Sequence, residues 1–108
     1  MRQLEGVIPV LLTPFTEVGE IDELALGRLV EYLNGKNVGG FWVLGTGAED
    51  MNLTYQQRLR VVETVVEANS GKTPLVVGAG FFAMRDTVNF INDTSHLDFD
   101  AYHYMPYH

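Results

Sequence analysis

The sequence contains no cysteine, which excludes disulfide bonds and metal sites built on thiolates. It also lacks a basic cluster, because seven Lys and Arg residues are scattered among 14 Asp and Glu residues and the formal net charge is −7. Nucleic acids and anionic membranes are bound by concentrated positive charge, so we expect neither partner. No apolar run is long enough to span a bilayer, and residues 1–12 do not have the pattern of a signal peptide. We therefore expect a cytoplasmic protein.

The composition is that of a folded chain. Of the 108 residues, 46% are hydrophobic and 19% are charged, which is typical of a globular domain and not of a disordered segment. No low-complexity stretch or charge run divides the chain. We expect residues 1–108 to belong to a single domain.

Short apolar segments alternate with segments of helical periodicity. Asp22 is placed to cap one helix and Thr54, with Gln57 three residues later, to begin another through a capping box. A third helix is predicted from Met84 to about His96, with Val88 and Ile91 facing inward. The predicted strands are Gly6–Leu12, Phe41–Leu44, Leu75–Val77 and Ala101–Met105. The first of them reads as a strand buried on both faces, and the order β-α-β-α-β-α-β indicates parallel βα units.

Small and polar residues follow each predicted strand. The four motifs are Thr13-Pro14, Gly45-Thr46-Gly47, Gly78-Ala79-Gly80 and Pro106-Tyr107-His108. Because the carboxyl ends of parallel strands meet at one edge, we expect these motifs to lie together. In parallel α/β folds that edge carries the ligand site.

The segment Gly45-Thr46-Gly47 is open to three interpretations: a phosphate cradle, a tight turn, or a site for a small organic acid. It is too short for a phosphate-binding loop, and it lacks the three spaced glycines of a dinucleotide site. Glu49 and Asp50 would repel phosphate. The residues alone leave a plain turn and a carboxylate site as the stronger alternatives.

The aromatic run at the carboxyl end offers candidates for proton transfer. Tyr107 and His108 lie past Pro106, where a phenol and an imidazole could pass protons. His103 is expected to be a buried, hydrogen-bonded core histidine, and Trp42 a core residue. The histidines have no carboxylate or cysteine at ligand spacing, so we expect no metal and no other cofactor.

Taken together, the motifs resemble the dihydrodipicolinate synthase / N-acetylneuraminate lyase family. The resemblance rests on the motif after each predicted strand and on the spacing between them, and it covers the whole chain. The motifs are Thr13-Pro14-Phe15, Gly45-Thr46-Gly47-Ala48-Glu49 with Leu53, Gly78-Ala79-Gly80 and Pro106-Tyr107. The resemblance implies a parallel (β/α)₈ barrel of the TIM type, of which this chain covers about the first half, and a class I aldolase that binds pyruvate or another 2-keto acid as a lysine Schiff base.

The resemblance also implies roles for individual residues. Thr46 matches a threonine that relays protons together with tyrosines. The next family threonine, which helps to hold the substrate carboxylate, is replaced here by Gly47, so that backbone N–H groups of Gly45, Thr46 and Gly47 would hold it. The family motif Pro-Tyr-Tyr becomes Pro106-Tyr107-His108, whose imidazole would take the place of the second tyrosine, often found at a subunit contact. We therefore expect a homo-oligomer, a dimer or tetramer, acting on a small 2-keto acid.

A complete (β/α)₈ barrel needs about 250 residues. The resemblance sets the Schiff-base lysine on strand six and a catalytic tyrosine on strand five, neither of which has a counterpart in these residues. Lys36 and Lys72 follow helices and belong to the opposite edge of the sheet. We expect the 108-residue chain alone to be inactive. Two alternatives stay open: a non-catalytic half barrel that acts as an interaction module, and a doubly wound α/β domain that binds a small ligand.

Overall fold

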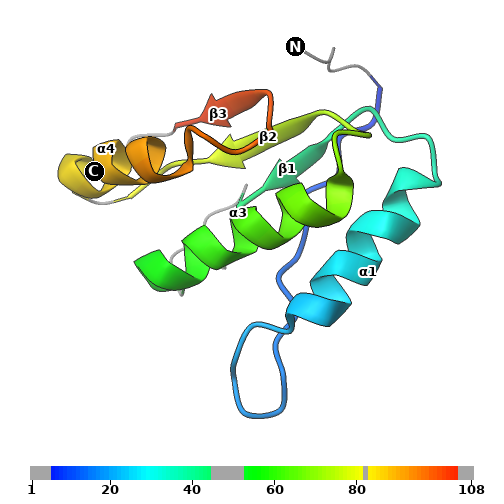
Figure 1. Cartoon of the computed structure of the whole chain (residues 1–108), viewed down its shortest axis with the longest axis horizontal. Helices are drawn as coiled ribbons and strands as arrows, with labels where there is room; N and C mark the ends of the chain where they lie inside the picture. Colours follow the sequence, from blue (N-terminus) through cyan, green and yellow to red (C-terminus); the bar gives the residue numbers. More distant parts are fainter. Residues whose placement is uncertain (1–5, 45–52, 82, 105–108) are drawn as a thin grey trace.

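The computed structural model describes residues 6–44, 53–81 and 83–104 of the chain. Helices and strands alternate along it, as the sequence predicts (Figure 1). The elements are α1 (Glu23–Asn34), β1 (Phe41–Val43), α3 (Tyr55–Asn69), β2 (Leu75–Gly78), α4 (Met84–Thr94) and β3 (Ala101–His103).

The three strands form one parallel sheet in the order β1-β2-β3. Residues near Val10 extend this order by one place, because Val10 forms a parallel bridge with Trp42. Two hydrogen bonds flank the bridge, from the Leu11 N–H to the Trp42 carbonyl (3.0 Å) and from the Trp42 N–H to the Pro9 carbonyl (2.9 Å). The spatial order therefore follows the chain order. This arrangement contradicts the doubly wound alternative, which would place the first segment between the second and third.

The first predicted strand is the least regular part of the sheet. Only Val10 is paired in the pattern of a strand, and Val7 and Leu12 are 74% and 65% exposed, so the expectation of burial on both faces is wrong. Pro9 has no N–H to donate. Within the described residues this segment has a strand neighbour on one side only, and the edge and one face stay open to solvent.

Both predicted helix starts are confirmed. The Asp22 carboxylate accepts a hydrogen bond from the Ala25 N–H (3.0 Å) at the start of α1. At the start of α3 the Thr54 hydroxyl accepts from the Gln57 N–H (3.1 Å), and the Gln57 side chain accepts from the Thr54 N–H (2.8 Å). Each contact satisfies a backbone donor that the first helical turn leaves free, which fixes where the helix begins.

The core lies between the sheet and its helices. Alternate strand residues are fully buried on the helix side: Phe41, Val43, Leu75 and Val77. The helices contribute Leu26 and Val30 from α1, and Val61, Val62 and Val65 from α3. Residues of the opposite parity, including Trp42, Val76 and Ala101, are only half-buried. The described helices thus cover one face of the sheet, which agrees with the (β/α)₈ barrel that the resemblance implies (Figure 1).

The inward face of α4 differs from the prediction. Thr87, Phe90 and Thr94 are buried there, whereas Val88 is 48% exposed, so its predicted inward position is wrong. Ile91 packs against the core, as predicted. The threonines fit this face because their hydroxyls can bond to the backbone: the Thr94 hydroxyl donates to the Phe90 carbonyl (2.7 Å). Apolar periodicity alone therefore placed the buried stripe one residue away from its true position.

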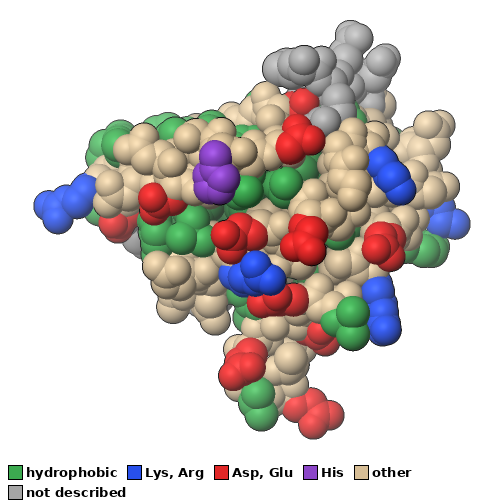
Figure 2. Space-filling model, in the orientation of Figure 1, with side chains coloured by type: hydrophobic (Ala, Val, Ile, Leu, Met, Phe, Trp, Pro, Cys, Tyr) green, Lys and Arg blue, Asp and Glu red, His purple; other side chains and the backbone are tan. Residues whose placement is uncertain are grey.

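The surface is acidic over the helices. Figure 2 shows carboxylate side chains spread across the face that carries α1 and α3, with basic side chains between and beside them. None of the helices in the described residues is long and apolar enough to cross a membrane. A short loop, closed by an antiparallel bridge between Phe15 and Ile21, projects from the carboxyl-end side of the first segment before α1 begins (Figure 1).

Candidate functional site at the carboxyl ends of the strands

The ends of β1 and β2 touch through their backbones. A Cβ atom added to Gly78 would lie 2.0 Å from the Leu44 carbonyl oxygen, far inside any allowed contact. Leu44 itself has a φ of +58°, a left-handed conformation that is uncommon for a residue with a side chain. Glycine at position 78 is therefore required by the close approach, and Leu44 adopts a backbone conformation that is costly for its residue type.

Arg58 reaches the same edge from α3. Its side chain is buried, with 4% of the residue exposed, and its Nη1 donates to the Gly80 carbonyl at 2.6 Å. The guanidinium carbon lies 4.1 Å from the centre of the Phe81 ring, a cation–π distance. A charged donor to a carbonyl makes a stronger hydrogen bond than a neutral one. Arg58 thus joins the first turn of α3 to the segment that follows β2.

Sequence reasoning missed Arg58, although one signal was present. Position 58 falls in register with Val61, Val62 and Val65, all of which are buried. An arginine on the apolar stripe of a helix has to find a partner inside the protein. The identity of that partner, a backbone carbonyl 22 residues away, has no mark in the sequence.

A second polar group lies between α3 and α4. The Tyr55 hydroxyl donates to the Asp93 carboxylate at 2.5 Å, and the Tyr55 ring packs 5.6 Å and 5.8 Å from the rings of Phe81 and Phe90. Burial, followed by the hydrogen bond to Asp93, raises the pKa of Tyr55 above its ordinary value. In the structure the phenol serves as a hydrogen-bond donor to Asp93.

The hollow beside Tyr55 has a volume of about 310 Å³ and a polar lining. Its lining residues are Tyr55, Asp86, Asn89, Asn92 and Asp93. Across residues 6–44, 53–81 and 83–104, no three His, Cys, Asp or Glu side chains are grouped as metal ligands would be.

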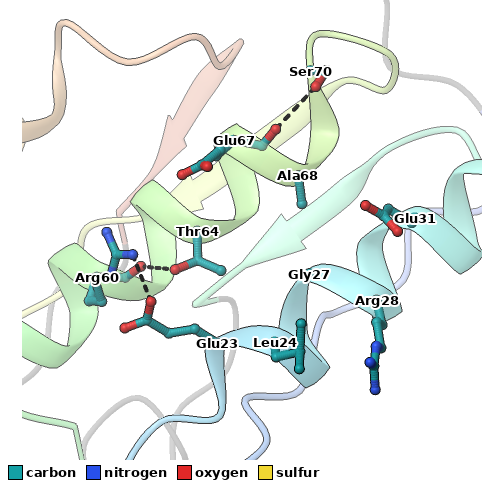
Figure 3. A pocket seen from close by; sticks show the side chains of 10 residues that line it. All are labelled: Glu23, Leu24, Gly27, Arg28, Glu31, Arg60, Thr64, Glu67, Ala68 and Ser70. Carbon is teal, nitrogen blue, oxygen red and sulfur yellow. Dashed lines mark hydrogen bonds and ion pairs between the residues drawn. The ribbon is translucent and has the colours of Figure 1, made fainter.

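A larger hollow, of about 550 Å³, lies on the outer surface between α1 and α3 (Figure 3). Gly27 and Ala68 meet at its floor, and Glu23 contacts Arg60 at 2.6 Å on one side. Both charged side chains are nearly half exposed, and the hydrogen bond to Arg60 lowers the pKa of Glu23. This hollow lies on the helix layer away from the sheet. The Glu23 and Arg60 charges are paired with each other and open to solvent.

The structure describes the neighbours of the predicted site residues and not those residues themselves. Gly45, Thr46 and Gly47, predicted to bind a carboxylate, and Tyr107 and His108, predicted to move protons, all lie outside the described residues. What the structure describes is the chain on either side: Leu44, which precedes the first group directly, and β3, which ends four residues before Tyr107.

His103 and Trp42 differ from their predicted positions in the core. Both lie on the half-buried face of the sheet, where the imidazole meets the indole edge-on with ring centres 4.6 Å apart. The parity of the strands explains this, because Tyr102, next to His103, points to the helix side and donates its hydroxyl to the Ile91 carbonyl at 3.1 Å.

Lys36 and Lys72 lie between a helix and the strand that follows it. Lys36 is bonded to the end of α1 through its N–H to the Leu33 carbonyl, and Lys72 to the end of α3 through its N–H to the Asn69 carbonyl. The connection from helix to strand leads to the amino ends of parallel strands. Both lysines are therefore on the edge opposite to Leu44 and Gly78, as predicted.

Known proteins resemble this chain along nearly its whole length. Residues 3–108 match the model of the dihydrodipicolinate synthetase family. The 4-hydroxy-tetrahydrodipicolinate synthase of Streptococcus mutans is 34% identical over 83% of the chain and 31% of its own length. That of Salinibacter ruber is 38% identical over 79% of the chain and 28% of its own length.

Solved structures give the same result. Dihydrodipicolinate synthase from Aquifex aeolicus superposes with a TM-score of 0.88 at 30% identity, over 97% of this chain and 36% of its own. N-acetylneuraminate lyase from Proteus mirabilis superposes with a TM-score of 0.88 at 27% identity, over 94% of this chain and 35% of its own. The chain thus spans about a third of the length of the relatives it matches.

Proposed function

The chain belongs to the dihydrodipicolinate synthetase family, and we propose that the complete protein binds pyruvate or a related 2-keto acid as a Schiff base on a lysine outside these residues. The fold is part of an α/β barrel, as in the relatives' structures. The reaction would be a condensation, a cleavage or a dehydration at the carbon next to the imine. The observation that carries the proposal is the match over residues 3–108, because it includes the segments in which the resemblance sets Thr46, Tyr107 and His108.

The proposed roles belong to residues that come directly after the predicted strands. Backbone N–H groups of Gly45, Thr46 and Gly47 would hold the substrate carboxylate, and the Thr46 hydroxyl would relay protons with Tyr107 and His108. The position of Leu44 at the carboxyl end of a parallel strand supports this, because barrel enzymes carry their sites at that edge. Because position 47 is glycine, the carboxylate-binding segment lacks the hydroxyl that a threonine would supply. The preferred keto acid would therefore differ from that of relatives with a threonine at this position.

The remaining expectations belong to the same proposal. No cofactor is needed, since the lysine imine itself withdraws electrons from the reacting carbon. We expect a homo-oligomer in the cytoplasm, with His108 near a subunit contact.

A second candidate is a non-catalytic half barrel that associates with another polypeptide. It is favoured by the open face of the sheet, where Trp42, Val76 and Ala101 are half-buried, and by the exposure of Leu12 in the first segment. A parallel sheet is normally covered on both faces. In this alternative the covering half would come from another polypeptide.

Borohydride trapping of the complete protein with pyruvate tests the first proposal. Reduction of the imine adds the pyruvate skeleton to one lysine by a stable bond, which mass spectrometry of peptides locates. We expect the modified lysine outside residues 1–108. Variants with Lys36→Met and Lys72→Met serve as controls and should be labelled as fully as the wild type. Absence of an adduct in the folded complete protein would refute the proposal and leave the half barrel.

The role of Thr46 is tested by Thr46→Val in the complete protein. The substitution keeps the shape and removes the hydroxyl, so kcat should fall by about 10²-fold or more, the scale of a positioned proton-transfer group. Gly47→Thr is the matched variant. It adds a hydroxyl to the proposed carboxylate-binding segment and should change KM for the keto acid. An unchanged kcat in Thr46→Val would show that the Thr46 hydroxyl takes no part in proton transfer and that this segment is only a turn.

A further inference from the structure

The edge formed by the ends of β1 and β2 contains two contacts that lie two residues apart on the same segment. Leu44 turns left-handed at the end of β1, and its carbonyl oxygen rests against Gly78, where there is no room for a side chain. Gly80, two residues further, accepts the hydrogen bond from buried Arg58. The first is a backbone-to-backbone contact, and the second is a charged hydrogen bond of 2.6 Å.

The segment between these contacts is itself well fixed. Ala79 is fully buried, and its N–H donates to the His103 carbonyl at 2.8 Å, which joins the end of β2 to the end of β3. Arg58 holds the carbonyl of the next residue from the helix side. Residues 78–80 are therefore held both by the sheet and by α3.

We propose that Arg58 is a positioning residue, which fixes Gly78-Ala79-Gly80 against Leu44 and thereby sets the direction in which the chain leaves β1. Only 4% of Arg58 is exposed, and the guanidinium donates to the backbone carbonyl of Gly80. The effect of Arg58 on the strand ends stands on the described contacts alone. Its effect on catalysis rests on the proposed function, since Thr46 lies two residues after Leu44.

Loss of this contact should act on the site more than on the fold. A displacement of about 1 Å at a reacting group costs about 10²-fold in rate, so Arg58→Met should lower kcat/KM by roughly 10–100-fold. Arg58→Lys keeps the positive charge and loses the planar guanidinium, which cannot be replaced by an ammonium at a fixed stacked position. It should give a smaller loss in the same direction.

Two variants separate positioning from general stability. Arg60→Met changes an arginine on the same helix that is paired with Glu23 and Glu63 at the surface. Val65→Ala removes methyl groups from a fully buried position in the core and destabilises the fold without touching the strand ends. Both should keep kcat/KM within about twofold of the wild type at temperatures well below unfolding.

Amide hydrogen exchange in the complete protein gives a readout that does not depend on activity. Arg58→Met should speed exchange of the Ala79 N–H, and Arg58→Lys should do so to a smaller extent, relative to the amides of α1 in the same protein. Val65→Ala should speed both groups equally, because it acts through global unfolding. If the wild type fails to trap pyruvate, the proposed function fails, and the Ala79 exchange still decides the role of Arg58.

The quantity to compare is the exchange rate of the Ala79 N–H divided by that of the α1 amides. The positioning role is overturned if this ratio is the same in Arg58→Met as in Val65→Ala. It is also overturned if Arg58→Lys matches the wild type in both exchange and kcat/KM, since the guanidinium would then be dispensable. Should Arg58→Met fail to fold, the Arg58→Lys protein carries the same two measurements.

Discussion

Two arginines on α3 stand two positions apart and have opposite surroundings. Arg58 is 4% exposed and binds a backbone carbonyl at the carboxyl-end edge of the sheet. The Arg60 side chain is 46% exposed and pairs with carboxylates on the outer face. Exposed pairs are screened by water and salt and contribute little to stability, whereas a buried charged hydrogen bond is costly to break. The strand-end edge is thus rigidly specified, and the outer helix face tolerates change.

The largest effect that would sharpen this contrast is expected from Gly78→Ala. A Cβ at position 78 would lie 2.0 Å from the Leu44 carbonyl, so one of two backbones has to move. We expect the free energy of unfolding to fall by about 3 kcal/mol, at the upper end of overpacking effects. Denaturant unfolding of the complete protein measures it, with kcat/KM measured alongside. Wild-type stability in the Gly78→Ala protein would show that the two strand ends are not in contact.

The matched substitution on the outer face is Gly27→Ala, and its sign should be opposite. A Cβ there would lie 3.8 Å from the Ala68 Cβ, an ordinary van der Waals contact. Alanine is better than glycine within a helix by roughly 0.5–1 kcal/mol, so α1 should be stabilised by about that amount. The midpoint of thermal unfolding should rise by a few degrees. A lower midpoint would mean that α1 and α3 pack more tightly than this distance indicates, and the contrast between the two regions would be lost.

The smallest effect is expected at the Glu23–Arg60 pair. The hydrogen bond from Arg60 lowers the pKa of Glu23 below its ordinary value of 4.5. A lowered pKa in the folded state stabilises the fold above the unfolded-state pKa, and this contribution disappears as the pH falls through the folded-state value. Glu23→Gln should therefore unfold at a slightly lower temperature than the wild type at pH 7, and the difference should shrink as the pH falls below 4.5.

Glu31→Gln is the control for that measurement, because Glu31 lines the same hollow and its removal changes the net charge equally. Added salt should shrink the effect of Glu23→Gln at pH 7. A large loss of stability in Glu23→Gln, comparable to that of Gly78→Ala, would break the comparison, since the outer face would then be as tightly specified as the strand ends.

Local signals in the sequence account for most of the fold. Asp22 and the pair Thr54 and Gln57 fix helix starts through contacts within three residues, so they can be read directly from the chain. The order of the strands followed from the spacing of the βα units. Errors arose where burial depends on distant neighbours: Val7 and Leu12 are apolar and yet exposed, because the described residues leave that side of the first segment open.

The candidate site was less accessible to sequence reasoning. Glycines after the strands directed attention to the carboxyl-end edge, but the left-handed turn falls on Leu44, a residue type that seldom adopts it. Arg58 was missed because its acceptor is a carbonyl of the main chain, which every residue possesses. His103 was assigned to the core from its apolar surroundings, and only the pairing of Gly78 with His103 sets the face on which its ring lies. The roles of Gly45, Thr46, Gly47, Tyr107 and His108 stay predictions.

The position of Trp42 beside His103 makes this tryptophan a fluorescence probe for one face of the sheet. Trp42 is the single tryptophan of these 108 residues, and its indole nitrogen is shielded from solvent with no hydrogen-bond partner in the described residues. An indole in such surroundings emits at shorter wavelength than one in water. Because the ring lies on the face away from the helices, its emission responds to whatever covers that face. Following the Trp42 emission while a candidate partner polypeptide is titrated into this chain would therefore measure the covering of that face as a binding curve.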